Sequence, residues 1–361
     1  MSCRTNDVIK PLISIIIPIH NGEEWIDTCF ESILRQTIIS VIHVEIAICD
    51  DASTDKTLEI LDKWKDIFNK MSISLHIFKN ETGLPKGVGY AKNRAVEISS
   101  GDYLCFQDID DIMLPKRIET QYKLAKTNQS AFCDQIIGGR FKRKPENSTE
   151  RFVRWANNLI HEQLQIQIYT SYGPTVIMPT WFCHRNVFNN VPGGFSEKGY
   201  GTPEDLIFFY AHIENNGSVL RTDEVILEYL FHPGATTLSI KQETIFELRV
   251  QQVEKRVLFK WPSFTIWNAG KEGRKFFRTL REKFQKRVIA FCDVDKKKIG
   301  KKYTPYDHSI RRSKVPIPIE HYSIAKPPFI ICVKLDMTNG IFEKNLNSLN
   351  LKEDKDYILF N

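Results

Sequence analysis

The sequence lacks any apolar run that approaches the roughly 20 residues of a membrane-spanning helix. Its N-terminus also lacks a basic segment followed by a long apolar core, which a secretory signal would need. Both absences argue against a membrane-bound or secreted enzyme. We therefore expect a cytoplasmic protein that does not contact a membrane.

Paired cysteines are also absent. The eight cysteines contain no Cys-x-x-Cys pair, which argues against a zinc site or a disulfide framework. Several lie in apolar, strand-like runs, so we predict buried thiols. The 42% hydrophobic and 26% charged residues are ordinary for a globular protein.

Charge is unevenly distributed along the chain. Residues 262–361 carry 21 Lys and Arg against 11 Asp and Glu, whereas residues 1–261 carry 29 against 33. This asymmetry predicts a mildly acidic first domain and a basic second domain with an anionic partner. We place the first domain at residues 1–240, a helical linker at 241–261 and the second domain at 262–361.

Strand-like and helix-like segments alternate in the first half of the chain. Residues 13–19 and 44–49 form apolar runs, and an amphipathic helical pattern follows each of them. The alternation predicts an α/β fold with a parallel sheet. Ligands of such sheets bind beyond the carboxyl ends of the strands.

Three carboxylates occur within four residues, at Asp108, Asp110 and Asp111, directly after an apolar strand-like run. They would repel one another and lose hydration unless a cation lay among them, so a metal site is one interpretation. A solvated acidic turn before a helix that starts near Pro115 is the other.

Five motifs follow one another in the order Pro18-Ile19-His20-Asn21-Gly22-Glu23, Asp50-Asp51-Ala52-Ser53-Thr54-Asp55, Ala91-Lys92-Asn93-Arg94, Gly101-Asp102-Tyr103 and Asp108-Ile109-Asp110-Asp111. In order and spacing they resemble the family 2 glycosyltransferases of GT-A fold, over roughly residues 11–240. The resemblance implies a GT-A, Rossmann-like nucleotide-sugar domain. The residues that follow it predict a smaller Rossmann-like α/β domain.

The resemblance also implies roles for single residues. Asp51 would accept the uracil N–H of a UDP-sugar, Asp108 would face the ribose, and Asp110 would bind a divalent metal, Mn or Mg. The other donor-site positions that it implies are Pro18, His20, Asn21, Glu23, Asp50, Lys92, Asn93 and Ile109. Lys92 stands where the family often has Arg; a salt link to phosphate and a helix-surface position are both open.

A catalytic pair is predicted at Glu204 and Asp205. Asp205 follows glycine turns and precedes the apolar residues 206–209, and the desolvation expected there would raise its pKa toward that of a general base. The resemblance makes Asp205 the base and Glu204 its positioning neighbour; a helix cap is the alternative. His232 follows a predicted strand over 225–230, and the resemblance implies a metal ligand there rather than an ordinary polar residue.

The second domain resembles a dinucleotide-binding fingerprint in which Asn268 replaces the first glycine. Asp293 takes the position of the ribose acid, but the missing glycine favours a half-Rossmann fold without a cofactor. A helix is predicted over 274–284, and Lys271, Arg274 and Lys275 at its start favour a bound phosphate. Sixteen Lys and Arg against five acids between residues 271 and 314 predict a polyanion partner.

The two-domain layout, with residues 264–271 and 331–338, resembles a member of the family that modifies tRNA. This resemblance implies an inverting transfer of galactose from UDP-galactose to the queuosine base of a tRNA anticodon, with tRNA-Tyr as the expected acceptor. The alternatives are a cytosolic N-acetylglucosaminyltransferase acting on a glycan or protein, and a non-catalytic nucleotide-sugar or RNA-binding module. No protein partner is indicated.

Overall fold

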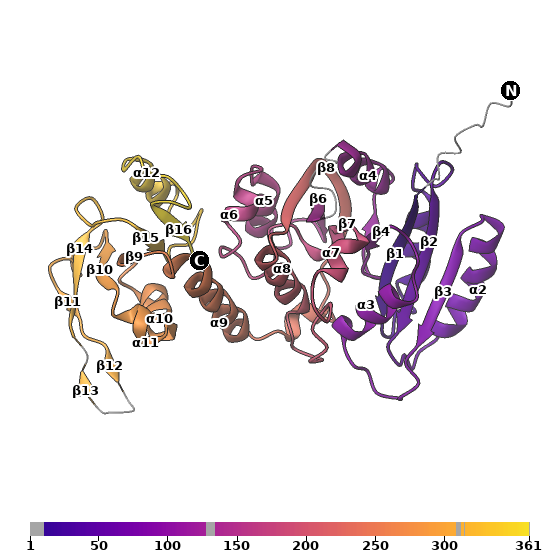
Figure 1. The fold of residues 1–361 in the computed structure, drawn as a ribbon, viewed down its shortest axis with the longest axis horizontal. Coiled ribbons are helices and arrows are strands. Elements are labelled where there is room, and N and C mark those ends of the chain that lie inside the picture. The colour runs from indigo at the N-terminus through magenta and orange to yellow at the C-terminus, as the bar shows by residue number, and fades with distance from the viewer. Residues whose placement is uncertain (1–10, 128–133, 308–311, 314, 361) are drawn as a thin grey trace, which may run out of the picture. The chain divides into compact units, whose positions relative to one another are not determined.

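The computed structural model describes residues 11–127, 134–307, 312–313 and 315–360. The chain divides into two compact units (Figure 1). Unit 1 comprises Met1–Leu164 and Gly173–Ile240, and unit 2 comprises Gln165–Tyr172 and Lys241–Asn361. Each unit is built around its own mixed or parallel sheet, so the α/β fold class is confirmed.

Unit 1 contains an eight-stranded sheet of order β3-β2-β1-β4-β7-β6-β8-β5. Its strands are β1 Leu12–Ile19, β2 His43–Asp50, β3 Ser74–Lys79, β4 Tyr103–Phe106, β5 Ile112–Met113, β6 Gln135–Lys144, β7 Phe182–His184 and β8 Ser218–Leu230. The helices are α1 Ile26–Leu34, α2 Thr57–Lys70, α3 Val88–Glu97, α4 Arg117–Thr127, α5 Glu150–Asn158, α7 Arg185–Asn189 and α8 Glu204–Glu214; α6 Gln163–Ile166 crosses the division between the units.

The first four strands of the order are parallel, as the sequence predicts. All of β1 after its first residue is buried, because helices cover both faces of a parallel sheet. Figure 1 shows α2 alongside β3. Two aromatic side chains of α2, Trp64 and Phe68, pack on Phe30 of α1. The turns after β1, β2 and β4 consequently lie at one edge of the sheet.

The rest of this sheet is mixed. β7 pairs antiparallel with β4 and β6, whereas β6 and β8 run parallel. The expected strand over 225–230 is the end of β8, which begins at Ser218. Its pairing with β6 and β5 places the segment after Leu230 near the acidic turn that follows β4.

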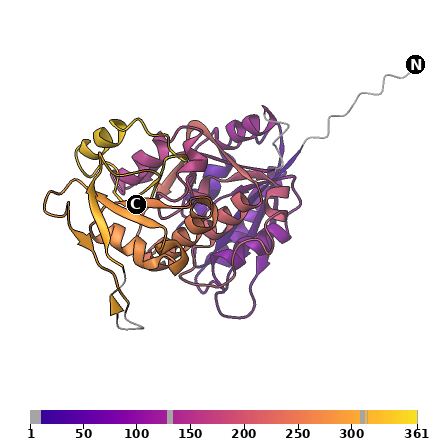
Figure 2. The same ribbon diagram turned by 60° about the vertical axis from the view of Figure 1, so that its left-hand side comes forward.

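Unit 2 has a six-stranded sheet of order β11-β14-β10-β9-β15-β16. The strands are β9 Phe264–Trp267, β10 Val288–Asp293, β11 Lys302–Tyr303, β14 Ile317–His321, β15 Phe329–Ile331 and β16 Tyr357–Leu359, with a separate pair β12 Tyr306–Asp307 and β13 Arg312–Ser313. The helices are α9 Gln242–Val253, α10 Lys271–Thr279, α11 Glu282–Gln285 and α12 Ile341–Asn347. Figures 1 and 2 show α10 and α11 on one side of the strands and α12 on the other.

The five strands other than β11 are parallel, and they follow the Rossmann order. The helix after β9 differs from the prediction of 274–284 at both ends. It begins at Lys271 and ends at Thr279. It can begin early because Gly273 packs on the backbone of Asn268, where a Cβ atom would lie 1.9 Å from the carbonyl oxygen.

The segment 241–261 is part of unit 2 rather than a linker. It forms α9 and the π-helical turn Glu254–Leu258. Phe246 packs edge-on against Phe360, and Arg249 is buried and donates to the carbonyl oxygen of Tyr169. The apolar face that the sequence shows here therefore packs into the second unit.

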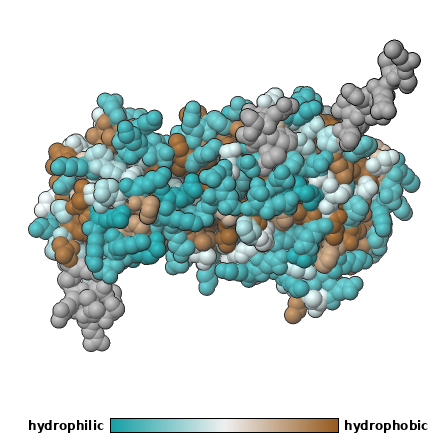
Figure 3. All heavy atoms as spheres, viewed as in Figure 1, coloured by the Kyte–Doolittle hydropathy of each residue, from teal (hydrophilic) through white to brown (hydrophobic). Residues whose placement is uncertain are grey.

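The surface in the view of Figure 3 is mainly hydrophilic, with apolar residues scattered among polar ones. None of the helices in the described part of the chain combines the length and the apolar composition that crossing a bilayer requires.

A buried carboxylate ties the amino ends of three strands together. Glu45 of β2 accepts hydrogen bonds from Ser14 Oγ and from the backbone N–H groups of Ser100 and Gly101, at 2.6, 2.6 and 3.0 Å. Burial alone would raise the pKa of Glu45, but these hydrogen bonds outweigh it and hold the pKa below the ordinary value of 4.5. The ionised form is therefore the one that stabilises the fold.

Glu45→Gln should lower the free energy of unfolding at neutral pH by about 1–3 kcal/mol, because buried N–H donors lose their charged acceptor. Because the pKa of Glu45 is lower in the folded than in the unfolded protein, its carboxylate stabilises the fold at pH values above 4.5. The difference in unfolding free energy between wild type and Glu45→Gln should therefore shrink as the pH falls below 4.5. Urea denaturation at several pH values measures this. Glu59→Gln, which removes an exposed pair with Lys63, is the control and should change stability little; equal effects of the two would contradict the assignment.

Candidate active site

The acidic turn after β4 is held by a buried arginine. Arg117 of α4 is fully buried and donates to the carbonyl oxygen of Phe106 at 2.6 Å and to the side-chain oxygen of Gln107 at 2.7 Å. The Gln107 amide in turn donates to the carbonyl oxygens of Asp108 and Asp111, each at 2.8 Å. This network fixes the backbone of the turn, so the carboxylates have defined directions.

The three carboxylates of the turn converge. One oxygen from each of Asp108, Asp110 and Asp111 lies within 4.8 Å of the others. Burial and then the charge of Asp110 raise the pKa of Asp111 well above its ordinary value. Burial raises the pKa of Asp108 to about 7; Lys92 opposes this shift and Asp110 adds to it. The turn therefore stores repulsion that a cation would relieve, which disfavours a simple solvated turn.

His232, two residues after the end of β8, lies against one member of this cluster. Its Nε2 lies 2.8 Å from Oδ2 of Asp110, and the indole ring of Trp25 packs 5.2 Å from the imidazole. Asp111 Oδ1 accepts the N–H of Leu230, which ties the end of β8 to the acidic turn. The predicted pair Asp110 and His232 is thus brought together from 122 residues apart in sequence.

The residues present fit a divalent metal. Oδ1 of Asp108 and Oδ2 of Asp111 are buried and have no hydrogen-bond partner among the described residues. Carboxylate oxygens with one imidazole are ligands that Mg²⁺ and Mn²⁺ accept. Asp110 and His232 would hold such an ion, with Asp108 and Asp111 close to it.

Asp51 lies at the end of β2 in a cradle of donors. Its carboxylate accepts the side-chain amide of Asn80 and the backbone N–H groups of Lys86 and Gly87, at 2.7 to 3.0 Å. The carboxylate thereby fixes the loop between β3 and α3. Its predicted uracil contact would share these same oxygens. The neighbouring Asp50 is buried, and its Oδ1 has no partner among the described residues.

The turn after β1 interlocks with the turn after β2. His20 Nδ1 lies 2.7 Å from the carbonyl oxygen of Asp51. Asn21 accepts the N–H of Thr54 at 2.8 Å, and Glu23 accepts the N–H of Lys56 at the same distance. Three predicted donor-site residues therefore shape the rim through contacts within the protein. Pro18 is buried in β1, and the half-buried Ile109 lies over Gly22, whose Cβ would contact it at 3.5 Å.

Lys92 is buried, which excludes the helix-surface alternative. Its side chain is 1% exposed, and its Nζ lies 2.8 Å from Oε1 of Glu204, whose side chain is 8% exposed. Burial would lower the pKa of Lys92, but the charges of Glu204, Asp108 and Asp205 raise it above its ordinary value. This cation therefore stays protonated and offsets charge among three carboxylates.

Asp205 lies in the first turn of α8, beside this ion pair. The helix begins at Glu204 with Pro203 as its N-cap residue, so Asp205 is not the cap. Burial and then the charge of Glu204 raise the pKa of Asp205 to about 6, although Lys92 lowers it. A carboxyl group with this pKa is a base at neutral pH.

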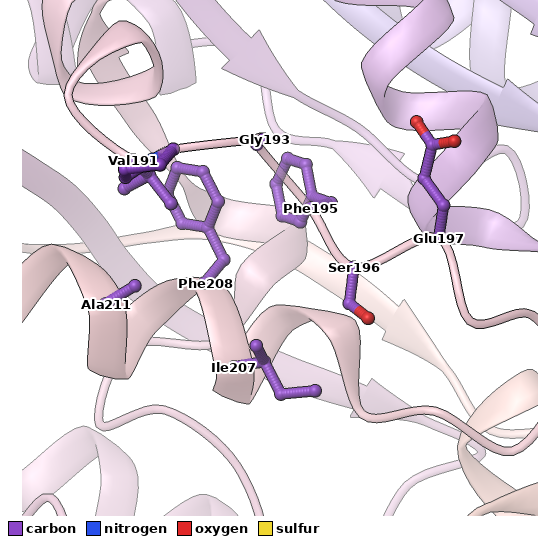
Figure 4. A pocket seen from close by; sticks show the side chains of 10 residues that line it. Val191, Gly193, Phe195, Ser196, Glu197, Ile207, Phe208 and Ala211 are labelled. Atoms are coloured by element: carbon purple, nitrogen blue, oxygen red, sulfur yellow. The ribbon is translucent and has the colours of Figure 1, made fainter.

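Asn93 holds the glycine loop that leads to α8. Its amide donates to the carbonyl oxygen of Phe195 and to Glu197, and its oxygen accepts the N–H of Phe195. The side chain of Asn93, which we predicted for the donor site, is therefore engaged in contacts within the protein. A pocket of about 400 Å³ lies between this loop and α8 (Figure 4).

Sequence reasoning missed Arg117, Gln107 and Asn80. Each is buried and supports a predicted site residue through hydrogen bonds. A buried Arg at the start of α4 has no local signal, because Phe106 and Gln107, to which it donates, lie at the end of β4 and directly after it.

Comparison with known proteins agrees with these motifs. Residues 14–191 match the family model "Glycosyl transferase family 2". The chain is 40% identical over 275 residues to a chondroitin synthase of Escherichia coli, covering 74% of this chain and 36% of that protein. It is 31% identical over 159 residues to the glycosyltransferase GlyG of Streptococcus pneumoniae, covering 44% of this chain and 49% of that one.

Among solved structures, TarS 1-349 of S. aureus in complex with UDP-GlcNAc is similar at a TM-score of 0.48 and 21% identity, covering 76% of this chain and 72% of that one. The chain spans about half the length, or less, of the first curated relatives it matches.

Asp110→Asn and His232→Ala should each weaken Mn²⁺-dependent binding of UDP by at least about 10- to 100-fold, the loss that even changes around a metal's ligands cause. Isothermal titration calorimetry with and without EDTA measures this. Asp102→Asn, an exposed carboxylate before β4, is the matched control and should bind as wild type does. Metal-independent binding, or wild-type affinity of both variants, would refute the assignment.

Proposed function

We propose that the protein transfers a sugar from a UDP-sugar to an acceptor hydroxyl with inversion. The match of residues 14–191 to the family model "Glycosyl transferase family 2" supports a sugar-transfer reaction. The observation that supports this most is the convergence of Asp108, Asp110 and Asp111 at one edge of the sheet, with His232 placed 2.8 Å from Asp110. Asp205 lies near the same cluster, since its charge and that of Asp108 both act on Lys92. This proximity supports a donor site with a general base beside it.

In this proposal Asp205 accepts the proton of the acceptor hydroxyl. The acceptor oxygen forms a bond to the anomeric carbon while the bond from that carbon to the UDP oxygen breaks. The charge of Lys92 lowers the pKa of Asp205. Lys92 also pairs with Glu204, whose buried negative charge would otherwise oppose the ionisation of Asp205. Glu204 therefore acts as a positioning residue.

A divalent cation held by Asp110 and His232 would supply positive charge to the departing diphosphate. The chain's own residues orient that site. Arg117 and Gln107 fix the turn, and Asp111 fixes the end of β8. Asp51 sets the loop that borders the nucleotide, through Lys86 and Gly87.

For the acceptor we propose a tRNA, and for the reaction the transfer of galactose from UDP-galactose to a queuosine base, the activity of a queuosine-tRNA galactosyltransferase. The basic character of unit 2 supports an RNA acceptor. Its exposed cations include Lys271, Arg278, Lys283, Lys296, Lys297, Lys301 and Lys302. Arg311 and Lys314, also part of the predicted polyanion surface, lie outside the described residues.

The helix start that was predicted to bind phosphate is partly used for packing. Arg274 lies 4.9 Å over the ring of Tyr303, and Lys275 lies 4.2 Å over Phe246 and 3.8 Å from Glu243. Asp293 accepts from Lys298 and from the N–H of Ala269. These contacts favour the half-Rossmann fold without a cofactor, and they shift the proposed RNA contacts to the exposed lysines.

The similarity to a chondroitin synthase favours a second candidate, a glycan acceptor. A glycan acceptor would fit the alternative prediction from the sequence, an N-acetylglucosaminyltransferase acting on a glycan or protein. Parallel assays with tRNA and with an oligosaccharide acceptor separate the two.

Asp205→Asn should lower transfer by a factor on the order of 100 to 10,000, because the proton acceptor is lost while the shape is kept. The rate of the wild type should rise with pH through about 6 and then level, because the base acts when deprotonated. Single-turnover rates across pH and UDP-sugar affinity measure both. A collapse of affinity with an intact rate for bound substrate would make Asp205 structural.

Reversing Lys296, Lys297 and Lys301 to Glu should weaken tRNA binding and flatten its salt dependence, by up to about 0.9 log unit per log unit of salt for each lost phosphate contact on a duplex. Filter binding over a range of salt concentrations measures the slope. A matched reversal of the exposed Lys63, Lys65 and Lys70 on α2 is the control and should leave it unchanged. Wild-type affinity and slope in the first variant would remove unit 2 from the RNA interface.

A further inference from the structure

Three loops of unit 1 meet beside the candidate site. The loop between β3 and α3 approaches the loop before α8, because a Cβ atom at Gly87 would lie 3.0 Å from Cα of Gly199. The second of these loops approaches the segment after His232, since a Cβ atom at Gly201 would lie 3.6 Å from the carbonyl oxygen of Ser239. Gly87, Gly199 and Gly201 all have positive φ, so glycine permits this close meeting.

Each of the three loops exposes one large apolar side chain. Leu84 is 72% exposed, Tyr200 is 85% exposed and Leu238 is 56% exposed. A single exposed apolar residue needs no explanation. Three of them on loops that meet, with an aromatic ring on the middle loop, mark a surface suited to an apolar, flat ligand. We call these three side chains the apolar rim.

The apolar rim is tied to the donor side and to the base. Lys86 and Gly87, on the loop of Leu84, donate their N–H groups to Asp51. Tyr200 precedes Asp205 by five residues, and the glycine turn around Tyr200 leads directly into α8. The ring of Tyr200 is therefore carried by the loop that leads into the helix of Asp205.

We propose that Tyr200 is the platform on which the planar base of the acceptor nucleotide stacks. The inference rests on the proposed function, and it names the part of the protein that selects a nucleobase over a glycan. Single-stranded nucleotides bind through stacking on exposed aromatic rings combined with nearby cations. The exposed Lys86 and Lys198 lie on the loops that flank the ring and supply charge for the adjoining phosphates. Leu84 and Leu238 border the stacked base.

Tyr200→Ala should raise KM for tRNA by about 5- to 150-fold, the range that loss of one base stack causes, with a smaller change in kcat. Tyr200→Phe keeps the ring and should stay within about twofold of wild type, since every base stacks on the π-face of a ring. Ile67→Ala removes a 40% exposed apolar side chain from α2 of unit 1 and is the control, which should leave KM unchanged.

The outcomes separate the inference from the proposed function. Absence of any transfer to tRNA by the wild type overturns both. Transfer by the wild type with an unchanged KM in Tyr200→Ala overturns only the stacking platform, as does an equal loss in Tyr200→Phe. A KM increase for an oligosaccharide acceptor, with none for tRNA, assigns the ring to a sugar and also overturns the inference.

Discussion

The buried ion pair between Lys92 and Glu204 connects the two halves of the site. It joins α3, which follows the donor-side strands, to α8, which carries the base. Removing one partner of such a pair leaves an uncompensated charge in the interior, which costs about 3–5 kcal/mol. The pair also sets the electrostatics, because the charge of Lys92 opposes the upward pKa shifts of Asp108 and Asp205. The ionisation of both Asp108 and Asp205 therefore depends on one lysine.

The parallel strands bring the other groups to this point. Because β1, β2 and β4 run in one direction, their carboxyl ends place Asp50, Asp51 and the acidic turn at one edge. β8 runs past the same edge and ends two residues before His232. The pairing of the strands thus brings together side chains that are far apart in sequence. The carboxylates that converge there repel one another, and a bound cation would relieve this repulsion.

Much of this was predictable from sequence, and the reasons are local. Apolar runs that end in Asp-rich turns predict parallel strands with a site at their ends, which applies to Asp51 and Asp110. Asp205 was predicted instead from the glycine turns before it and the apolar residues after it. The burial of Lys92 did not, because its partner Glu204 lies 112 residues away. Arg117 and Asn80 act through buried hydrogen bonds that leave no periodic pattern. The apolar face of 241–261 was visible, but the sequence did not indicate that it packs on Phe360 in unit 2.

The central claim is that this site transfers a sugar from a UDP-sugar to a tRNA base. The most direct measurement is incubation of the protein with UDP-galactose, Mn²⁺ and total tRNA, followed by mass analysis of the nucleosides. The account predicts a hexose added to queuosine, dependent on the metal and on UDP-galactose rather than UDP-N-acetylglucosamine. Sugar on an oligosaccharide acceptor and none on any nucleoside would contradict it.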